Sequence, residues 1–412
     1  MRRPASRYGA SVRLPSRRTI LTLSALTVGL GALALAQGSR AGAAAPFVPR
    51  DDSEVVERVP AGSTDPRVRE ENELRRALSK DPTDLPTATR LARLEIDESR
   101  ARSDPRYLGR AQAALGPWWD AETPPPDVLL LRATIRQSNH DFEGALADLD
   151  AVLRVRPADP QAWVTRSVVL TVRGDYDEAR VSCKPLAKLS TPLVAQVCIS
   201  SVDSMTGHAR TAYADLERAI AGATGATPLE EAWAVSTLGE VALRMGDHPA
   251  AERHFSRALA VDPNDSYTLG AFADMMLDLG RTAEVVRRLA DRTENDGLLL
   301  RLVLAEQAAR APEAGEHAET LRARYDASHR RGDTVHRREE ARFVLAVDKD
   351  PQRALELAKA NWTVQRETWD ARALLEAAIA AHDRDAARPV LAWLDASHGE
   401  DPKLLALAEK LR

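Results

Sequence analysis

The fold of this 412-residue chain is decided by a short stretch, Arg173-Gly174-Asp175-Tyr176-Asp177-Glu178-Ala179, that recurs along the sequence. Related stretches are Asn139-His140-Asp141-Phe142-Glu143-Gly144-Ala145 and Met245-Gly246-Asp247-His248-Pro249-Ala250-Ala251. Each combines a small polar turn with the start of a second helix. Ala145 and Ala179 are 34 residues apart, as are Gly246 and Gly280, while the steps from Ala179 to Ala212 and from Ala212 to Ala251 span 33 and 39. The chain therefore has an internal repeat of about 34 residues.

Apolar residues between these turns follow helical spacing, and no alternating strand pattern of useful length is found. The best unit places Leu238-Gly239 in its first helix and Ala251, Phe255 and Ala258 in its second, and it closes at Asp262-Pro263. A helix pair with this pattern resembles the tetratricopeptide-repeat (TPR) family. Small residues let the two helices approach closely, and a large residue fills the groove to the following helix. Because one pair cannot cover its own apolar face, the pairs must stack.

The resemblance implies an all-α fold, a right-handed superhelical solenoid of about eight to nine antiparallel helix pairs. We expect clear TPR units over residues 127–292, with degenerate helical pairs over 66–126 and 293–412 and a polar-faced cap helix at the C-terminal end. The composition agrees, because 44% hydrophobic but only 4% aromatic residues suit helices packed on alanine and leucine better than sheet cores.

Residues 1–36 have the pattern of a targeting segment. An arginine-rich stretch without acidic residues precedes the apolar run 20–36, which ends in the cleavage-like Ala34-Leu35-Ala36. Ser16-Arg17-Arg18-Thr19-Ile20-Leu21 resembles a twin-arginine signal, although Thr22 stands where that pattern favours lysine. We therefore expect export to the periplasm or cell envelope, with residues 1–36 either cleaved or kept as a single-span membrane anchor. Residues 37–65 have the composition of a flexible linker.

The charge balance argues against a nucleic-acid partner. Without residues 1–36, which hold six arginines, 51 basic residues face 61 acidic ones, a net charge of −10. Such a body is a poor match for phosphate backbones. No phosphate-binding loop, zinc-protease motif or nucleophile elbow occurs, and the scattered histidines are expected to be solvated. We therefore predict no catalytic residues, no metal site and no cofactor, and thus no enzyme.

Cys183 and Cys198 lie at equal distances from the bend around Ser190 and Thr191. Residues equidistant from a turn tend to face each other in a helical hairpin, so an oxidising compartment would allow a disulfide between them. The alternative is that both are small buried hydrophobic residues.

The TPR resemblance also implies that the first helix of each pair lines a concave groove. The positions that would point inward carry aromatic, polar and charged side chains; they are Trp233, Ser236, Glu240 and Arg244 in one unit and Tyr267, Asp274, Leu277 and Asp278 in the next. Trp233 would stack on Tyr267, with Glu240 and Asp274 beneath them. Such an acidic groove would hold a protein or peptide with basic and apolar groups. The alternative is that these side chains only solvate or cap the helices.

These expectations favour an exported scaffold or adaptor that mediates protein–protein interaction in the bacterial envelope. The alternative is an accessory or regulatory subunit of an envelope enzyme or of a transport or assembly system. Because TPR folds serve many unrelated roles, the fold itself does not name the process.

Overall fold

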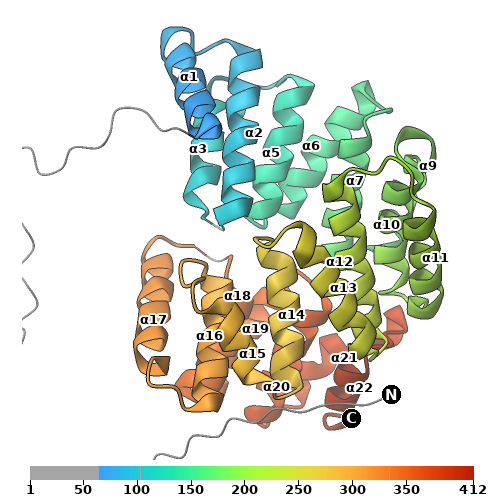
Figure 1. The fold of residues 1–412 in the computed structure, drawn as a ribbon, viewed down its shortest axis with the longest axis vertical. Coiled ribbons are helices and arrows are strands. Elements are labelled where there is room, and N and C mark those ends of the chain that lie inside the picture. Colours follow the sequence, from blue (N-terminus) through green and yellow to red (C-terminus); the bar gives the residue numbers. More distant parts are fainter. Residues whose placement is uncertain (1–64, 103, 334) are drawn as a thin grey trace, which may run out of the picture. The chain divides into compact units, whose positions relative to one another are not determined.

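The computed structural model describes residues 65–102, 104–333 and 335–412, which lie in one compact unit, Ser63–Arg412. The predicted targeting segment and nearly all of the predicted linker lie outside these residues. Every regular element of the described residues is helical (Figure 1). The prediction of an all-α solenoid of stacked helix pairs is confirmed.

Nine consecutive helix pairs make up the described part of the chain, preceded by α1 (Pro66–Lys80) and followed by α22 (Pro402–Glu409). In chain order the pairs are α2 (Leu85–Arg102) with α3 (Arg106–Ala114), α5 (Pro126–Ser138) with α6 (Phe142–Val155), α7 (Pro160–Arg173) with α8 (Tyr176–Cys183), α10 (Pro192–Asp203) with α11 (Ala209–Gly222), α12 (Pro228–Arg244) with α13 (His248–Val261), α14 (Ser266–Asp278) with α15 (Thr282–Leu289), α16 (Asp296–Ala309) with α17 (Ala314–Arg330), α18 (Arg337–Phe343) with α19 (Pro351–Trp362), and α20 (Thr368–Ala380) with α21 (Arg388–Ser397). Short turns of helix complete the set: α4 (Gly116–Trp119), α9 (Leu186–Leu189), a π-helical turn at Val344–Asp348 and a 3₁₀ turn at Asp385–Ala387.

The recurring turn ends one helix and begins the next. Gly174 ends α7 in the left-handed region at φ 83°, which a glycine adopts without a steric cost, and Gly246 does the same after α12 at φ 74°. Asp247 then caps α13, because its carboxylate accepts the Ala250 amide at 3.0 Å. His140 takes the glycine position after α5 and has φ 60°.

The two helices of the best-matching unit pack as its small residues require. Phe255 is completely buried, and a Cβ atom added to Gly239 would lie 2.7 Å from its ring. A side chain at position 239 would therefore force α12 and α13 apart, which explains why the crossing needs a glycine.

The C-terminal segment, residues 363–412, returns to the middle of the solenoid. It lies against the turns that follow α7, α10 and α12. A Cβ atom added to Gly174 would contact Arg366 and Trp393, one added to Gly207 would contact His398, and one added to Gly246 would contact Pro402. At the end of α14, Asp278 pairs with Arg372 and Lys403. In Figure 1, α21 and α22 accordingly lie near the lower ends of α12 and α13. The final helix thus does more than cover the end of the stack.

Candidate binding chamber

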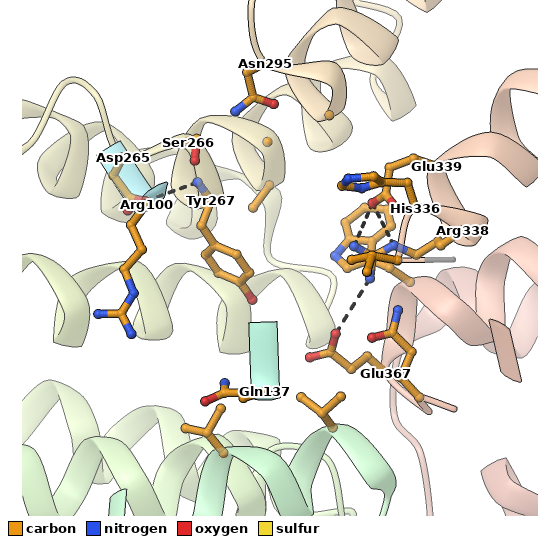
Figure 2. Close-up of a pocket in the computed structure, with 18 of the residues that line it drawn as sticks. Arg100, Gln137, Asp265, Ser266, Tyr267, Asn295, His336, Arg338, Glu339 and Glu367 are labelled. Carbon is orange, nitrogen blue, oxygen red and sulfur yellow. Dashed lines mark hydrogen bonds and ion pairs between the residues drawn. The ribbon is translucent and has the colours of Figure 1, made fainter. Parts of the chain in front are cut away.

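A cavity of about 1430 Å³, here called the chamber, lies between the first helices of the middle pairs and other parts of the chain. One wall consists of α7, α10, α12 and α14. The other walls come from residues 100–102, 104–107 and 137–142 at the ends of α2 and α5, from residues 294–301 at the start of α16, from residues 324–333 and 335–339, and from residues 365–369 of the C-terminal segment. Figure 2 shows Tyr267 and Glu367 pointing into the same space from two of these walls.

Large apolar side chains are exposed on the wall formed by the middle pairs. Val168 is 37% exposed, Leu229 is 71% exposed and Tyr267 is 61% exposed, and all three line the chamber. Trp233 lines it as well and is half-buried against Leu216 and its neighbours. Apolar surface of this kind on a concave wall is a common mark of a binding site.

The predicted pattern on this wall is only partly realised. Trp233 and Tyr267 both line the chamber, but the described residues contain no ring contact between them. The Tyr267 hydroxyl instead donates a hydrogen bond to Glu240. Glu240 also forms an ion pair with Arg244 at 3.6 Å, and Arg244 donates to the Ser204 hydroxyl at 3.0 Å. The expected stacking is therefore wrong, although Trp233, Glu240, Arg244 and Tyr267 share one wall.

The remaining predicted groove residues are engaged by the chain itself. Ser236 is buried and its hydroxyl lies 2.6 Å from the Thr268 hydroxyl. Asp274 is fully buried between Arg301 at 2.5 Å and Arg342 at 2.8 Å. Burial alone would raise the pKa of Asp274, but these two guanidinium groups lower it to about 2.

Asp278 lies at the end of α14, outside the chamber lining. It accepts from Arg372 at 2.6 and 2.7 Å and from Lys403 at 3.4 Å. The interpretation of Asp274 and Asp278 as open acidic groups of a groove is therefore wrong, because arginines and a lysine of distant helices already neutralise both. Leu277, between them, is half-buried against the core.

One cation in the wall opposite Tyr267 serves three carboxylates. The Arg338 guanidinium lies 2.7 Å from Glu339, 3.4 Å from Asp370 and 3.6 Å from Glu367. The pKa of Glu339 falls to about 2, because the attraction of Arg338 outweighs the effect of burial. Burial, followed by repulsion from Asp370, raises the pKa of Glu367 to about 7. This wall therefore carries more negative charge than its arginine can balance.

Glu367, Arg338 and Glu339 were not among the residues predicted from the sequence. They lie in the degenerate C-terminal repeats, where the TPR pattern is too weak to identify which positions face the groove. The chain offers one weak signal, the run Arg337-Arg338-Glu339-Glu340, but this run is indistinguishable from an ordinary charged helix surface.

Some histidines are less exposed than expected, among them His140 and His317. His140 lines the chamber and stacks on Phe142, with 5.4 Å between the ring centroids. Burial lowers the pKa of His140 to about 4. His317 and His329 instead lie within 2.9 Å and 2.8 Å of the carboxylates of Glu306 and Glu340.

The two cysteines form a disulfide in the structure, with 5.6 Å between their Cα atoms. Cys183 ends α8, Cys198 lies in α10, and both are buried, so the bond links two successive helix pairs beside the chamber.

Neither a metal-binding cluster nor a membrane-spanning helix is found among the described residues. No group of three or more histidine, cysteine, aspartate or glutamate side chains there is placed to hold a metal ion. Among the helices of the same residues, none is long and apolar enough to cross a membrane.

Comparison with known proteins locates the repeats. A family model for the tetratricopeptide repeat matches residues 130–182 and 236–291. No curated protein matches the chain.

Solved structures that match the chain are distant in sequence. The chain in the crystal structure of MamA is 20% identical in sequence to this chain. The match covers 43% of this chain and 94% of the MamA chain, with a TM-score of 0.27. A tetratricopeptide repeat protein from Parabacteroides merdae is 14% identical, with coverage of 75% and 99% and a TM-score of 0.34. The human IFIT1 dimer with m7Gppp-AAAA is 12% identical, with coverage of 84% and 85% and a TM-score of 0.44.

The two matched stretches fall on α5 to α8 and on α12 to α15, which are the helices whose turns and small residues carry the 34-residue repeat. The stacked helix pairs and the matched stretches therefore show that this chain contains tetratricopeptide repeats over these helices.

Proposed function

We propose that this TPR protein is an exported scaffold or adaptor that holds a segment of a partner protein in its chamber. Stacked helix repeats generally present concave surfaces on which other proteins bind. The observation that carries the proposal is the chamber wall itself, on which Tyr267 and Leu229 are exposed next to charged groups.

The charge of the chamber favours a partner segment with basic as well as apolar side chains. Glu240 pairs with Arg244 at 3.6 Å, and this arginine also donates to Ser204. Glu367 shares Arg338 with two other carboxylates. A lysine or arginine of the partner would relieve this excess of negative charge, while the Tyr267 ring offers a face for a cation–π contact.

Export is proposed from two features of the chain. The twin-arginine-like stretch around Arg17 and Arg18 precedes an apolar run, and an oxidising compartment would preserve the bond between Cys183 and Cys198. Protein recovered from its host should therefore be found outside the cytoplasm and should show no alkylation by a thiol reagent until it is reduced. Recovery of two free thiols from a cytoplasmic fraction would contradict this proposal.

A photo-crosslinking amino acid placed at position 267 tests the binding role directly. Tyr267 faces the chamber, so irradiation in the native host should join the chain to a defined partner, which mass spectrometry then identifies. Val155 serves as a matched control because it is 65% exposed but does not line the chamber. If both positions give the same products, or position 267 gives none, the chamber is not the binding site.

Charge reversal then tests which side chains the partner requires. Glu240→Arg places a positive charge on the chamber wall and should reduce partner capture at least tenfold, as expected for losing a well-placed charged contact. Glu252→Arg is the control, because Glu252 on the outer helix α13 pairs with Arg281, directly before the outer helix α15. Asp274 is unsuitable for this test, since reversing a fully buried charge would unfold the chain.

A further inference from the structure

We infer that a second cavity, which lies between α17, α18 and α19, is a binding site for a small organic carboxylate. This cavity, here called the small cavity, has a volume of about 340 Å³, at the lower end of the range of small-molecule sites. Ser328, Asp333 and His336 line both the small cavity and the chamber, so the two are neighbours. The inference goes beyond the proposed function, because the small cavity takes a ligand of its own.

Each of the three helices presents one face to the small cavity. On α17 the lining residues are spaced by one helical turn, at Tyr325, Ser328 and His329, and on α18 they are Arg337 and Glu340. α19 adds the face that runs from position 353 to position 360. Residues with such spacing lie on the same side of a helix, so three rigid elements fix the shape of the site.

Tyr325 is the residue that first points to a ligand. It lines the small cavity, is 4% exposed, and packs edge-on against Phe343 with 5.6 Å between the ring centroids. Its hydroxyl is buried and has no hydrogen-bond partner among the described residues. Burial raises the pKa of Tyr325 well above its ordinary value, so the hydroxyl keeps its proton. A buried hydroxyl costs stability unless an acceptor reaches it.

Other donors of the lining are also short of acceptors. Arg337 is half-buried, and its guanidinium forms no ion pair or hydrogen bond within the part of the chain that the structure describes. Arg353 holds its acidic neighbours only loosely, with 3.6 Å to Glu356 and 3.9 Å to Glu340. Two guanidinium groups and a phenol therefore border the small cavity with hydrogen-bonding capacity to spare.

The carboxylates of the same lining are already engaged. Glu340 lies 2.8 Å from Nε2 of His329, and Asp333 accepts the Val335 amide at 3.1 Å. The Glu356 side chain is 72% exposed, so water solvates it. The unmet capacity of the small cavity is therefore that of donors, and an anion satisfies it.

The apolar part of the lining indicates that this anion carries a hydrocarbon group. Leu357, which is 6% exposed, and Ala360 lie on the α19 face. An inorganic anion would lose water there without any replacement, whereas a carbon chain packs against both side chains. A guanidinium binds a carboxylate through two parallel hydrogen bonds. Arg337 and the Tyr325 hydroxyl thus hold the carboxylate, and Leu357 and Ala360 hold the hydrocarbon part.

Calorimetric titration of the full chain tests the site. The probes are straight-chain carboxylates from acetate to octanoate together with phenylacetate, and the primary amide of each acid is its matched comparison. At least one carboxylate should bind about tenfold more tightly than its amide, because hydrogen bonds to a charged group contribute that much. Inorganic phosphate, titrated in the same way, should bind more weakly than the best carboxylate.

Two variants assign the binding to the small cavity. Tyr325→Phe removes only the hydroxyl and Arg337→Gln only the charge, so each should weaken the best carboxylate about tenfold. Tyr325→Phe should also melt at or above the wild-type temperature, because it removes a buried hydroxyl that lacks an acceptor. Arg330→Gln is the control, since Arg330 is an exposed residue of α17 outside the lining, and this variant should bind as wild type does.

Three results would overturn the site. If no carboxylate binds more tightly than its amide, the small cavity holds water alone. If phosphate binds more tightly than every carboxylate, the site takes an inorganic anion. If Tyr325→Phe and Arg337→Gln both bind as wild type does, the carboxylate binds elsewhere on the chain. None of these titrations involves a partner protein, so their outcome is independent of the proposed function.

Discussion

At the scale of single residues, His140 occupies the place that glycine takes in the equivalent turns. Its φ of 60° lies in the left-handed region, where a side chain costs about 1–2 kcal/mol. His140→Gly should therefore stabilise the fold by about 1 kcal/mol, after loss of the contact with Phe142 is allowed for. Thermal unfolding measures the change. Gly174→Ala is the reciprocal variant and should destabilise, so a loss of stability in both would contradict this account of the turn.

Glu367 and its neighbouring carboxylate Asp370 together give the stability a pH dependence. Its pKa is about 7 in the folded chain and 4.5 when unperturbed, so the folded state binds the proton more tightly. The stability associated with that proton is complete below about pH 4.5 and is lost as the pH rises through about 7. Glu367→Gln imitates the protonated side chain, so its melting temperature should exceed that of wild type at pH 8 and should match it near pH 4.5.

Glu339 provides the matched control for this pH dependence. Its carboxylate is already ionised, with a pKa of about 2, and pairs with Arg338 at 2.7 Å. Glu339→Gln should therefore lower the melting temperature at both pH values. A Glu367→Gln variant that shows the same offset from wild type at pH 8 and pH 4.5 would rule out a raised pKa for Glu367.

At the scale of helices, the disulfide joins α8 to α10, which belong to different pairs. Cys183 and Cys198 are separated by 15 residues, and closing a loop of that length stabilises a fold by about 3 kcal/mol. Replacing both cysteines with serine should lower the free energy of unfolding by about that amount. Reductant should lower the melting temperature of wild type to that of the variant. If reductant added to the unfolded wild-type chain leaves its melting temperature unchanged, no disulfide forms.

At the scale of the whole molecule, the sequence predicts the stack well because each helix pair repeats the same local signals. Gly239 and Phe255 were recognised as a crossing and its filler, and they pack in that way. Trp233, Glu240 and Tyr267, which were expected to point inward, line the chamber, since a helix fixes which face a residue occupies.

The partners of these positions could not be predicted in the same way. Asp274 and Asp278 are both aspartates of α14, yet their arginine partners, Arg342 and Arg372, lie far along the chain and in different helices. Such long-range pairs depend on the curvature that builds up over the whole stack, and no single repeat carries a sequence signal for that curvature. The return of the C-terminal segment was missed for this reason.

That return also changes how the protein should unfold. In an open array each pair contacts only its neighbours, so melting can start at one end and spread pair by pair. Here Tyr176, near the middle of the chain, lies within hydrogen-bonding distance of partners 190 and 217 positions later. Loss of the last helices therefore removes support from pairs in the middle of the stack, and the two parts should melt together in one cooperative transition instead of by fraying from the end.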